Sequence, residues 1–202
     1  MSGSGEIHAE IHGEDWYGDD LADVRHEQIR FVEVDLTEVR TAGAVFEGST
    51  FDRCRFNASV HMATAFVGCT FSGTSFFDAT LDGCKLTGST FTRCTLKPIT
   101  VRGGQWRGVL LRGADLTGQD LSGVDLREAD LSMAVLAGAT LRGTDLSGAE
   151  LREADLTDAD LRGASLAGSD LDAANLRGAR VDLEGAVLLA ERTGAVVDVS
   201  ER

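Results

Sequence analysis

Residues 114–158 read ADLTG QDLSG VDLRE ADLSM AVLAG ATLRG TDLSG AELRE ADLTD when they are divided into fives. Leucine fills the third place of every group, a small residue usually fills the first, and aspartate most often fills the second. We name the five places, in order, the small, outward, central, flanking and corner positions. A period of five matches neither the 3.6-residue period of an α-helix nor the two-residue period of a β-strand, so this stretch is not an ordinary helix or strand.

The same frame extends over most of the chain without a slip. Central positions recur at every fifth residue from Ile11 to Val181, and only His26, Thr41 and His61 among them are not apolar. The central residues are mostly phenylalanine in the first half and leucine in the second. We therefore expect one continuous core that changes from a phenylalanine core to a leucine core near Lys97-Pro98, where proline should lie at a corner or bulge.

Small and central residues both point inward if they are alternate residues of an extended segment. Because five is odd, the chain must turn in every repeat to keep the next central side chain inside. Glycine occupies 19 of the corner positions, and glycine accepts the positive φ that such a turn requires. Four turns close a square, so we predict an all-β fold, a right-handed quadrilateral β-helix whose coils stack about 4.8 Å apart.

The residue types that usually carry chemistry fall inside this frame. Every cysteine occupies a small position: Cys54, Cys69, Cys84 and Cys94. We expect buried structural side chains there, because no CxxC pair or zinc-ligand spacing is present. His26 and His61 are expected to be hydrogen-bonded inside or turned outward. Without a P-loop, a GxSxG motif or an expected cleft, the sequence predicts a binding protein with no cofactor and no metal, rather than an enzyme.

The outward positions of the second half form the candidate partner-binding surface. They hold nine acidic residues: Asp115, Asp120, Asp125, Asp130, Asp145, Glu150, Asp155, Asp160 and Asp170. Residues 20 apart share a face, so Asp130, Glu150 and Asp170 are expected to form a vertical ladder, partly offset by arginines at flanking positions. Two interpretations remain open: aspartate is only the preferred polar residue of the repeat, or the ladder is an acidic stripe on a rod about as wide as duplex DNA.

The formal charge of the chain is −14, distributed as −9 over residues 1–50, +4 over 51–110, −6 over 111–180 and −3 over 181–202. An acidic protein is repelled by nucleic acid, so we expect no direct nucleic-acid binding and a partner with a basic surface. The alternative is that acidity only keeps the chain in solution. No signal peptide and no membrane-spanning run is present, which predicts a cytoplasmic protein.

The repeat frame also predicts the boundaries. Residues 1–10 are expected to form a flexible leader, 11–181 the β-helix, and 182–202 a C-terminal cap. The cap is predicted to contain a short helix that starts at Asp182 and stops at Gly194, followed by a possible strand over 195–199. The expected dimerisation residues on this helix are Leu183, Ala186, Val187, Leu189 and Ala190. A simple cap and a cap that also joins two chains about a twofold axis remain equally open.

The A(D/N)LxG pattern, as in Ala114-Asp115-Leu116-Thr117-Gly118, resembles the pentapeptide-repeat family over about 85% of the chain. The segment Cys94-Thr95-Leu96-Lys97-Pro98-Ile99-Thr100-Val101 closely resembles a mid-chain segment of the MfpA and Qnr type of fluoroquinolone-resistance proteins. So does Asp19-Asp20-Leu21, followed by Phe31 and Asp35, and the tail from Val181 is similar in length and pattern. The chain thus resembles an MfpA-like protein of a high-GC actinobacterium.

This resemblance implies a homodimeric rod that imitates duplex DNA, binds DNA gyrase and protects the enzyme from fluoroquinolones or similar gyrase poisons. Two features depart from it: the net positive charge of residues 51–110, and the absence of the long loops that protrude from the coil in some Qnr-type proteins. Two alternatives therefore stay open. One is an acidic β-helical scaffold with no topoisomerase partner, and the other is a self-immunity factor against an endogenous gyrase-targeting antibiotic.

Overall fold

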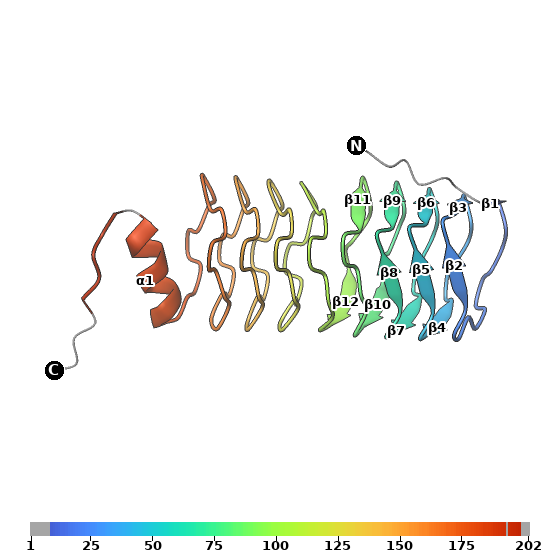
Figure 1. Ribbon diagram of the computed structural model, residues 1–202, viewed down its shortest axis with the longest axis horizontal. Coiled ribbons are helices and arrows are strands. Elements are labelled where there is room, and N and C mark those ends of the chain that lie inside the picture. The colour runs from blue at the N-terminus through green and yellow to red at the C-terminus, as the bar shows by residue number, and fades with distance from the viewer. Residues whose placement is uncertain (1–8, 193, 199–202) are drawn as a thin grey trace.

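The computed structural model describes residues 9–192 and 194–198. They form a right-handed quadrilateral β-helix, a stack of square coils closed at one end by a helix (Figure 1). Adjacent coils pair in parallel with a register of 20 residues, from Ala9↔Ile29 at the start to Asp160↔Arg180 at the end. Each coil therefore contains four repeats, as the sequence predicts.

Named strands occupy only the first half of the stack, and the coils after Arg102 are joined by isolated bridges (Figure 1). The β1 face carries β1 (Ala9–His12), β3 (Ile29–Val32), β6 (Thr50–Asp52), β9 (Thr70–Ser72) and β11 (Thr90–Thr92). The β4 face carries β4 (Arg40–Ala42), β7 (Val60–Met62), β10 (Ala79–Asp82) and β12 (Ile99–Arg102). The β2 face carries β2 (Arg25–Glu27), β5 (Val45–Glu47) and β8 (Ala65–Val67). The fourth face has bridges only, such as Asp15↔Asp35.

The corner position turns the chain as expected. Every residue in that position from Gly13 to Gly178 has a positive φ except Pro98, whose ring holds φ near −65°. Side chains larger than glycine also adopt this conformation, as at Asp23 with φ of 55° and Met133 with φ of 60°. The five-residue frame, more than the glycine itself, therefore determines where the chain turns.

The core is a set of vertical side-chain stacks. Ring centroids of Phe31 and Phe51 lie 4.7 Å apart, those of Phe51 and Phe71 4.9 Å, and those of Phe71 and Phe91 4.7 Å, each pair nearly parallel. These distances match the spacing of β-strands and confirm the expected coil rise. The leucine stack above them is equally buried, from Leu111 to Leu161.

All four cysteines are free thiols, and Cys94, which was expected to be buried with the others, is half-buried. Cys54, Cys69 and Cys84 are buried, and burial raises the pKa of Cys69 to about 12 and that of Cys54 to about 11. Thiols with such pKa values are not nucleophiles at neutral pH.

The hydrogen-bond ladder between coils is interrupted between residues 93–103 and 112–122, which we call the seam. Leu116 N–H donates to the Val135 carbonyl at 2.8 Å, whereas within the described residues no such bond joins Leu96 to Asp115, the equivalent pair one coil earlier. The same bond is missing between Val101 and Asp120. The ladder stays closed on the β2 face, where Trp106 N–H donates to the Asp125 carbonyl at 2.8 Å.

Three departures from the repeat explain the seam. Pro98 occupies a corner, where it can neither turn with positive φ nor donate an N–H. Ile99 and Gln119 stand in small positions one coil apart, and both are larger than the residues usually found there. Ile99 N–H donates to Oε1 of Gln119 at 3.3 Å. A small apolar cavity of about 10 Å³ lies in the core at the level of the seam, lined in part by Leu96, Ile99 and Leu116.

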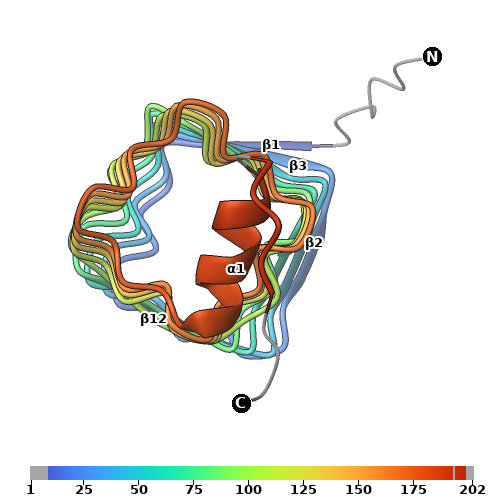
Figure 2. The same cartoon turned by 90° about the vertical axis from the view of Figure 1, so that its left-hand side faces the viewer.

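Helix α1 (Leu183–Arg192) lies across the open end of the last coil (Figure 2). Asp182 Oδ1 accepts the N–H of Gly185 at 2.9 Å, which confirms Asp182 as the N-terminal cap. Leu188 and Leu189 pack against the core. Two boundaries differ from expectation: the β-helix starts at Ala9 instead of 11, because β1 pairs with β3, and residues 195–198 form no strand. The rest of the expected leader, residues 1–8, lies outside the described residues, as does Val199 of the expected strand.

Candidate interaction faces

The nine carboxylates chosen from the sequence lie on all four faces of the rod. Bridges join Asp130 to Glu150 and Glu150 to Asp170, so these three form the expected ladder on the β1 face. Asp125 pairs with Asp145 on the β2 face. Valine or threonine separates the others, as in Asp115↔Val135↔Asp155 and Asp120↔Thr140↔Asp160.

The aspartates have a local structural role that the sequence frame did not reveal. In each of them Oδ1 accepts the backbone N–H two residues later, at 3.0 Å for Asp120 and Ser122 and at 2.9 Å for Asp130 and Ser132. This is an Asx turn, which stabilises the corner that follows. The preference for aspartate at the outward position is thus explained in part by backbone hydrogen bonding, whether or not a partner binds there.

Arginines neutralise Asp125, Asp145 and Asp160 on the β2 and β4 faces, whereas Asp120 bonds only to Ser122 among the described residues. Arg127 donates to both oxygens of Asp125, at 2.8 and 2.7 Å, and lies 3.7 Å from Asp145. Arg162 donates to both oxygens of Asp160, at 2.8 and 2.6 Å. Hydrogen bonds from these guanidinium groups hold the pKa values of Asp125 and Asp160 below their usual range. On these two faces the aspartates therefore do not form an uncompensated acidic surface.

The part of the β1 face nearest to α1 carries negative charge that arginines do not neutralise. Its outward-pointing residues at 130–133, 150–153 and 170–173, which we call the acidic half-face, include five carboxylates and one arginine. The carboxylates are Asp130, Glu150, Glu153, Asp170 and Asp172. Arg152 is bound to Asp170 at 3.1 Å, so most of the negative charge is uncompensated. Glu153 and Asp172 were missed by the sequence analysis because they occupy corner and flanking positions, outside the column that it followed.

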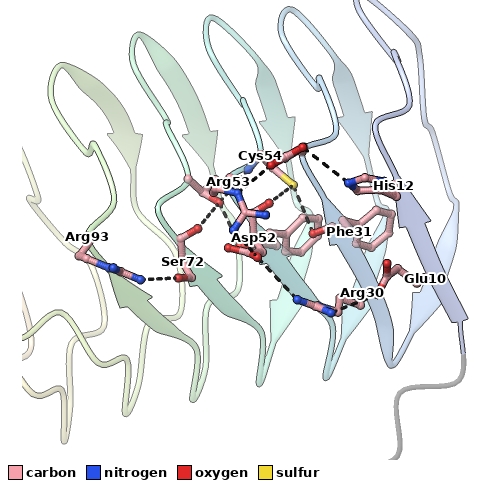
Figure 3. A network of polar contacts seen from close by, with 12 residues as sticks. Glu10, His12, Arg30, Phe31, Asp52, Arg53, Cys54, Ser72 and Arg93 are labelled. Atoms are coloured by element: carbon pink, nitrogen blue, oxygen red, sulfur yellow. Dashed lines mark hydrogen bonds and ion pairs between the residues drawn. The ribbon is translucent and has the colours of Figure 1, made fainter.

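Near the N-terminal end of the same face, carboxylates and arginines pair with one another (Figure 3). Arg30 lies 3.1 Å from Glu10 and 3.6 Å from Asp52. Arg53 lies 2.9 Å from both Asp52 and Glu33. The negative field of the β1 face is therefore concentrated near α1.

The residues expected to join two chains have unequal environments. Leu183 is 75% exposed and Ala186 is exposed, whereas Val187, Leu189 and Ala190 are half-buried. Leu189 contacts the core of its own chain, so it acts at least as part of the cap. The structure thus leaves Leu183 and Ala186 as the accessible part of this surface.

Within residues 9–192 and 194–198, no group of three His, Cys, Asp or Glu side chains is placed to hold a metal ion. Over the same residues, no helix has the length and apolar character to cross a membrane.

The model of the pentapeptide-repeat family matches residues 110–148 and 149–188 with eight copies, and the model of the SV2A/B/C luminal domain matches residues 19–96. No curated protein matches the sequence.

Among solved structures, a trypsin-treated variant of QnrB1, a plasmid-mediated fluoroquinolone resistance protein, is 21% identical over 95% of this chain and 99% of its own, with a TM-score of 0.59. A second trypsin-treated variant of QnrB1 is 21% identical over 94% of this chain and 97% of its own, with a TM-score of 0.56. HetL from the cyanobacterium Nostoc sp. strain PCC 7120, which is involved in regulating heterocyst differentiation, is 26% identical over 84% of this chain and 86% of its own, with a TM-score of 0.41. Residues 110–188 match the pentapeptide-repeat family, and the five-residue frame and 20-residue coil of the described chain give it the β-helical fold of pentapeptide-repeat proteins.

Proposed function

We propose that this protein is a DNA mimic that binds DNA gyrase through the acidic half-face and protects the enzyme from fluoroquinolones or similar gyrase poisons. The observation that carries the proposal is the uncompensated charge of that surface. Its net charge of −4 is spread over three coils, which corresponds to one charge per about 3.6 Å if coils rise by about 4.8 Å. One strand of duplex DNA carries one charge per about 3.4 Å.

A surface with this charge density attracts a protein that holds DNA with lysine and arginine. The fold shared with QnrB1 and the similarity of residues 94–101 to the MfpA and Qnr type both favour gyrase as that protein. The same charge disfavours binding of nucleic acid by this chain. We place the protein in the cytoplasm, where gyrase acts, and give it a role in binding rather than in catalysis.

We also propose that the active form is a homodimer joined through α1. A solenoid must cover its last coil, and Leu188 and Leu189 do so. Leu183 and Ala186 then remain available to pack against the same residues of a second copy about a twofold axis. Such a dimer would double the length of the rod and place two acidic half-faces next to its centre, since both lie near α1.

The proposal is tested by titrating the protein into gyrase supercoiling and DNA-cleavage assays, with and without a fluoroquinolone. Restored supercoiling and less cleaved DNA in the presence of the drug support protection. Inhibition without rescue retains gyrase as the partner but contradicts the protective role. If neither assay responds with gyrase from the source organism, the gyrase proposal is wrong and the scaffold alternative is favoured.

A further inference from the structure

A second surface on the β1 face adjoins the acidic half-face, with which it shares Asp130 and Met133, and combines features of a peptide-binding groove. A hollow of about 530 Å³ lies where this face meets the seam, and it is lined by residues of two successive coils, 90–93 and 110–113, with Asp130 at its upper end. A second hollow of about 220 Å³ shares Phe91, Arg93 and Arg112 and continues round the corner to Asp115. Both volumes are open to solvent on the described surface.

Apolar side chains are exposed here against the pattern of the repeat. Leu110 occupies an outward position and is 42% exposed. The other members of its column are all polar: Glu10, Arg30, Thr50, Thr70, Thr90, Asp130, Glu150 and Asp170. Met133 is 46% exposed at a corner position, and its sulfur lies 3.5 Å from a guanidinium nitrogen of Arg112. Two exposed aliphatic side chains at one place on a polar face indicate a contact surface.

Two cations in the groove have no carboxylate bound to them among the described residues. Arg93 donates to the hydroxyl of Ser72 at 3.4 Å (Figure 3), and Arg112 contacts only Met133. Arg30 and Arg53, lower on the same face, are both in ion pairs. An arginine without an anionic partner beside an apolar contact surface is suited to a carboxylate of a ligand.

The seam supplies backbone groups to the same groove. Gly73 N–H donates to the Thr92 carbonyl and Gly113 N–H to the Ser132 carbonyl, both at 2.9 Å. In the described chain no bond joins Arg93 N–H to the Arg112 carbonyl, which is the equivalent pair between them. An unpaired donor and an unpaired acceptor at the rim of a groove favour an extended peptide, whose backbone offers both groups.

We infer that this groove binds an extended segment of a partner protein in which an acidic side chain stands next to an aliphatic one. The acidic side chain binds Arg93 and Arg112, the aliphatic one packs against Leu110 and Met133, and the peptide backbone pairs with Arg93 N–H and the Arg112 carbonyl. This inference does not depend on gyrase binding, because the arginines that it uses, Arg93 and Arg112, lie outside the acidic half-face.

The test is an NMR titration of the full chain with the capped heptapeptide Ala-Asp-Leu-Asp-Leu-Asp-Ala. Its two controls replace all aspartates with lysine or all leucines with serine. We expect the amide signals of Thr92, Arg93, Leu110 and Arg112 to shift with the first peptide, and each control to bind at least tenfold more weakly. Equal binding of the lysine peptide, or shifts confined to other residues, would overturn the inference.

Variants of the chain complete the test. Arg93→Glu combined with Arg112→Glu should weaken binding of the aspartate peptide at least tenfold. The matched control, Arg177→Glu with Arg180→Glu, changes two other arginines that form no ion pair with any described residue, and it should leave affinity within twofold. Leu110→Thr restores the pattern of Thr50, Thr70 and Thr90, so the fold is retained while we expect at least fivefold weaker binding. An unchanged affinity in both groove variants would contradict the proposed site.

Discussion

Nδ1 of His61 lies 2.7 Å from the hydroxyl oxygen of Thr41, in a layer of the core where both residues are buried. Nε2 of the same ring lies 2.8 Å from Oγ of Ser59, which itself donates to the Phe56 carbonyl at 2.7 Å. Ser59 therefore accepts the Nε2 proton, and Nδ1 accepts the proton of Thr41. Both nitrogens of the neutral ring are hydrogen-bonded, and burial lowers the pKa of His61 to about 3.

This arrangement predicts that stability falls in mild acid. The pKa of His61 in the folded chain is about 3, below the ordinary value of 6.5, so the unfolded chain binds a proton first as pH falls. The stabilisation is complete above pH 6.5 and is lost between there and pH 3, with about 2 kcal/mol gone at pH 5. Urea unfolding at pH 7 and at pH 5 measures this loss of stability. In His61→Leu the difference between the two pH values should shrink by that amount; an equal difference in both proteins would contradict this assignment.

The glycine at position 104 has a different role from the corner glycines. A Cβ there would lie 2.6 Å from the Cys84 carbonyl oxygen and 2.9 Å from Nε1 of Trp106, at a φ of 119°. We expect Gly104→Ala to lower the free energy of unfolding by about 2–4 kcal/mol, from overpacking and backbone strain together.

Gly103→Ala is the matched control, because a Cβ there meets open space and alanine already adopts this corner conformation at Ala58 and Ala63. Its cost should be about 1 kcal/mol or less. Chemical unfolding of both variants gives the comparison. Equal losses would show that Trp106 and the Cys84 carbonyl do not restrict position 104.

The seam should open more readily than the rest of the stack. Amide hydrogens that lack a ladder partner exchange with solvent without local unfolding, so those of Leu96 and Val101 should exchange at least about tenfold faster than those of Leu116 and Leu121. Hydrogen exchange followed by NMR resolves the four residues. Uniform protection along these columns would mean that the ladder is continuous in solution.

The sequence frame predicted the coil, the inward residues, the buried cysteines and the ladder of Asp130, Glu150 and Asp170, because each depends only on spacing. It did not predict which carboxylates are neutralised. Arg127 and Arg162 stand two residues after their aspartates, and the frame alone did not show that such a pair can bind within one turn. For the seam, the sequence indicated only a corner or bulge at Pro98. It did not indicate the effects of Ile99 and Gln119, because these depend on the two residues being stacked one coil apart.

The proposed dimer predicts different effects for two leucines of α1. Leu183 is 75% exposed, so Leu183→Glu should leave the monomer folded and weaken the dimer at least about tenfold. Leu188 packs against the core, so Leu188→Glu should lower the free energy of unfolding by about 1–3 kcal/mol. Light scattering over a concentration series reports the dimer, and thermal unfolding reports the cap. A wild-type chain that stays monomeric at all concentrations would contradict the proposed dimer.

The most direct test of the account is the affinity of gyrase for two triple variants. In the first, Asp130→Asn, Glu150→Gln and Asp170→Asn remove charge from the acidic half-face, while asparagine still accepts the backbone N–H of its turn. In the matched control, Asp125→Asn, Asp145→Asn and Asp160→Asn remove as much charge from the β2 and β4 faces, where arginines already compensate it. The account predicts at least about tenfold weaker binding for the first variant and a change of about threefold or less for the second. Equal affinities for the two variants would contradict it.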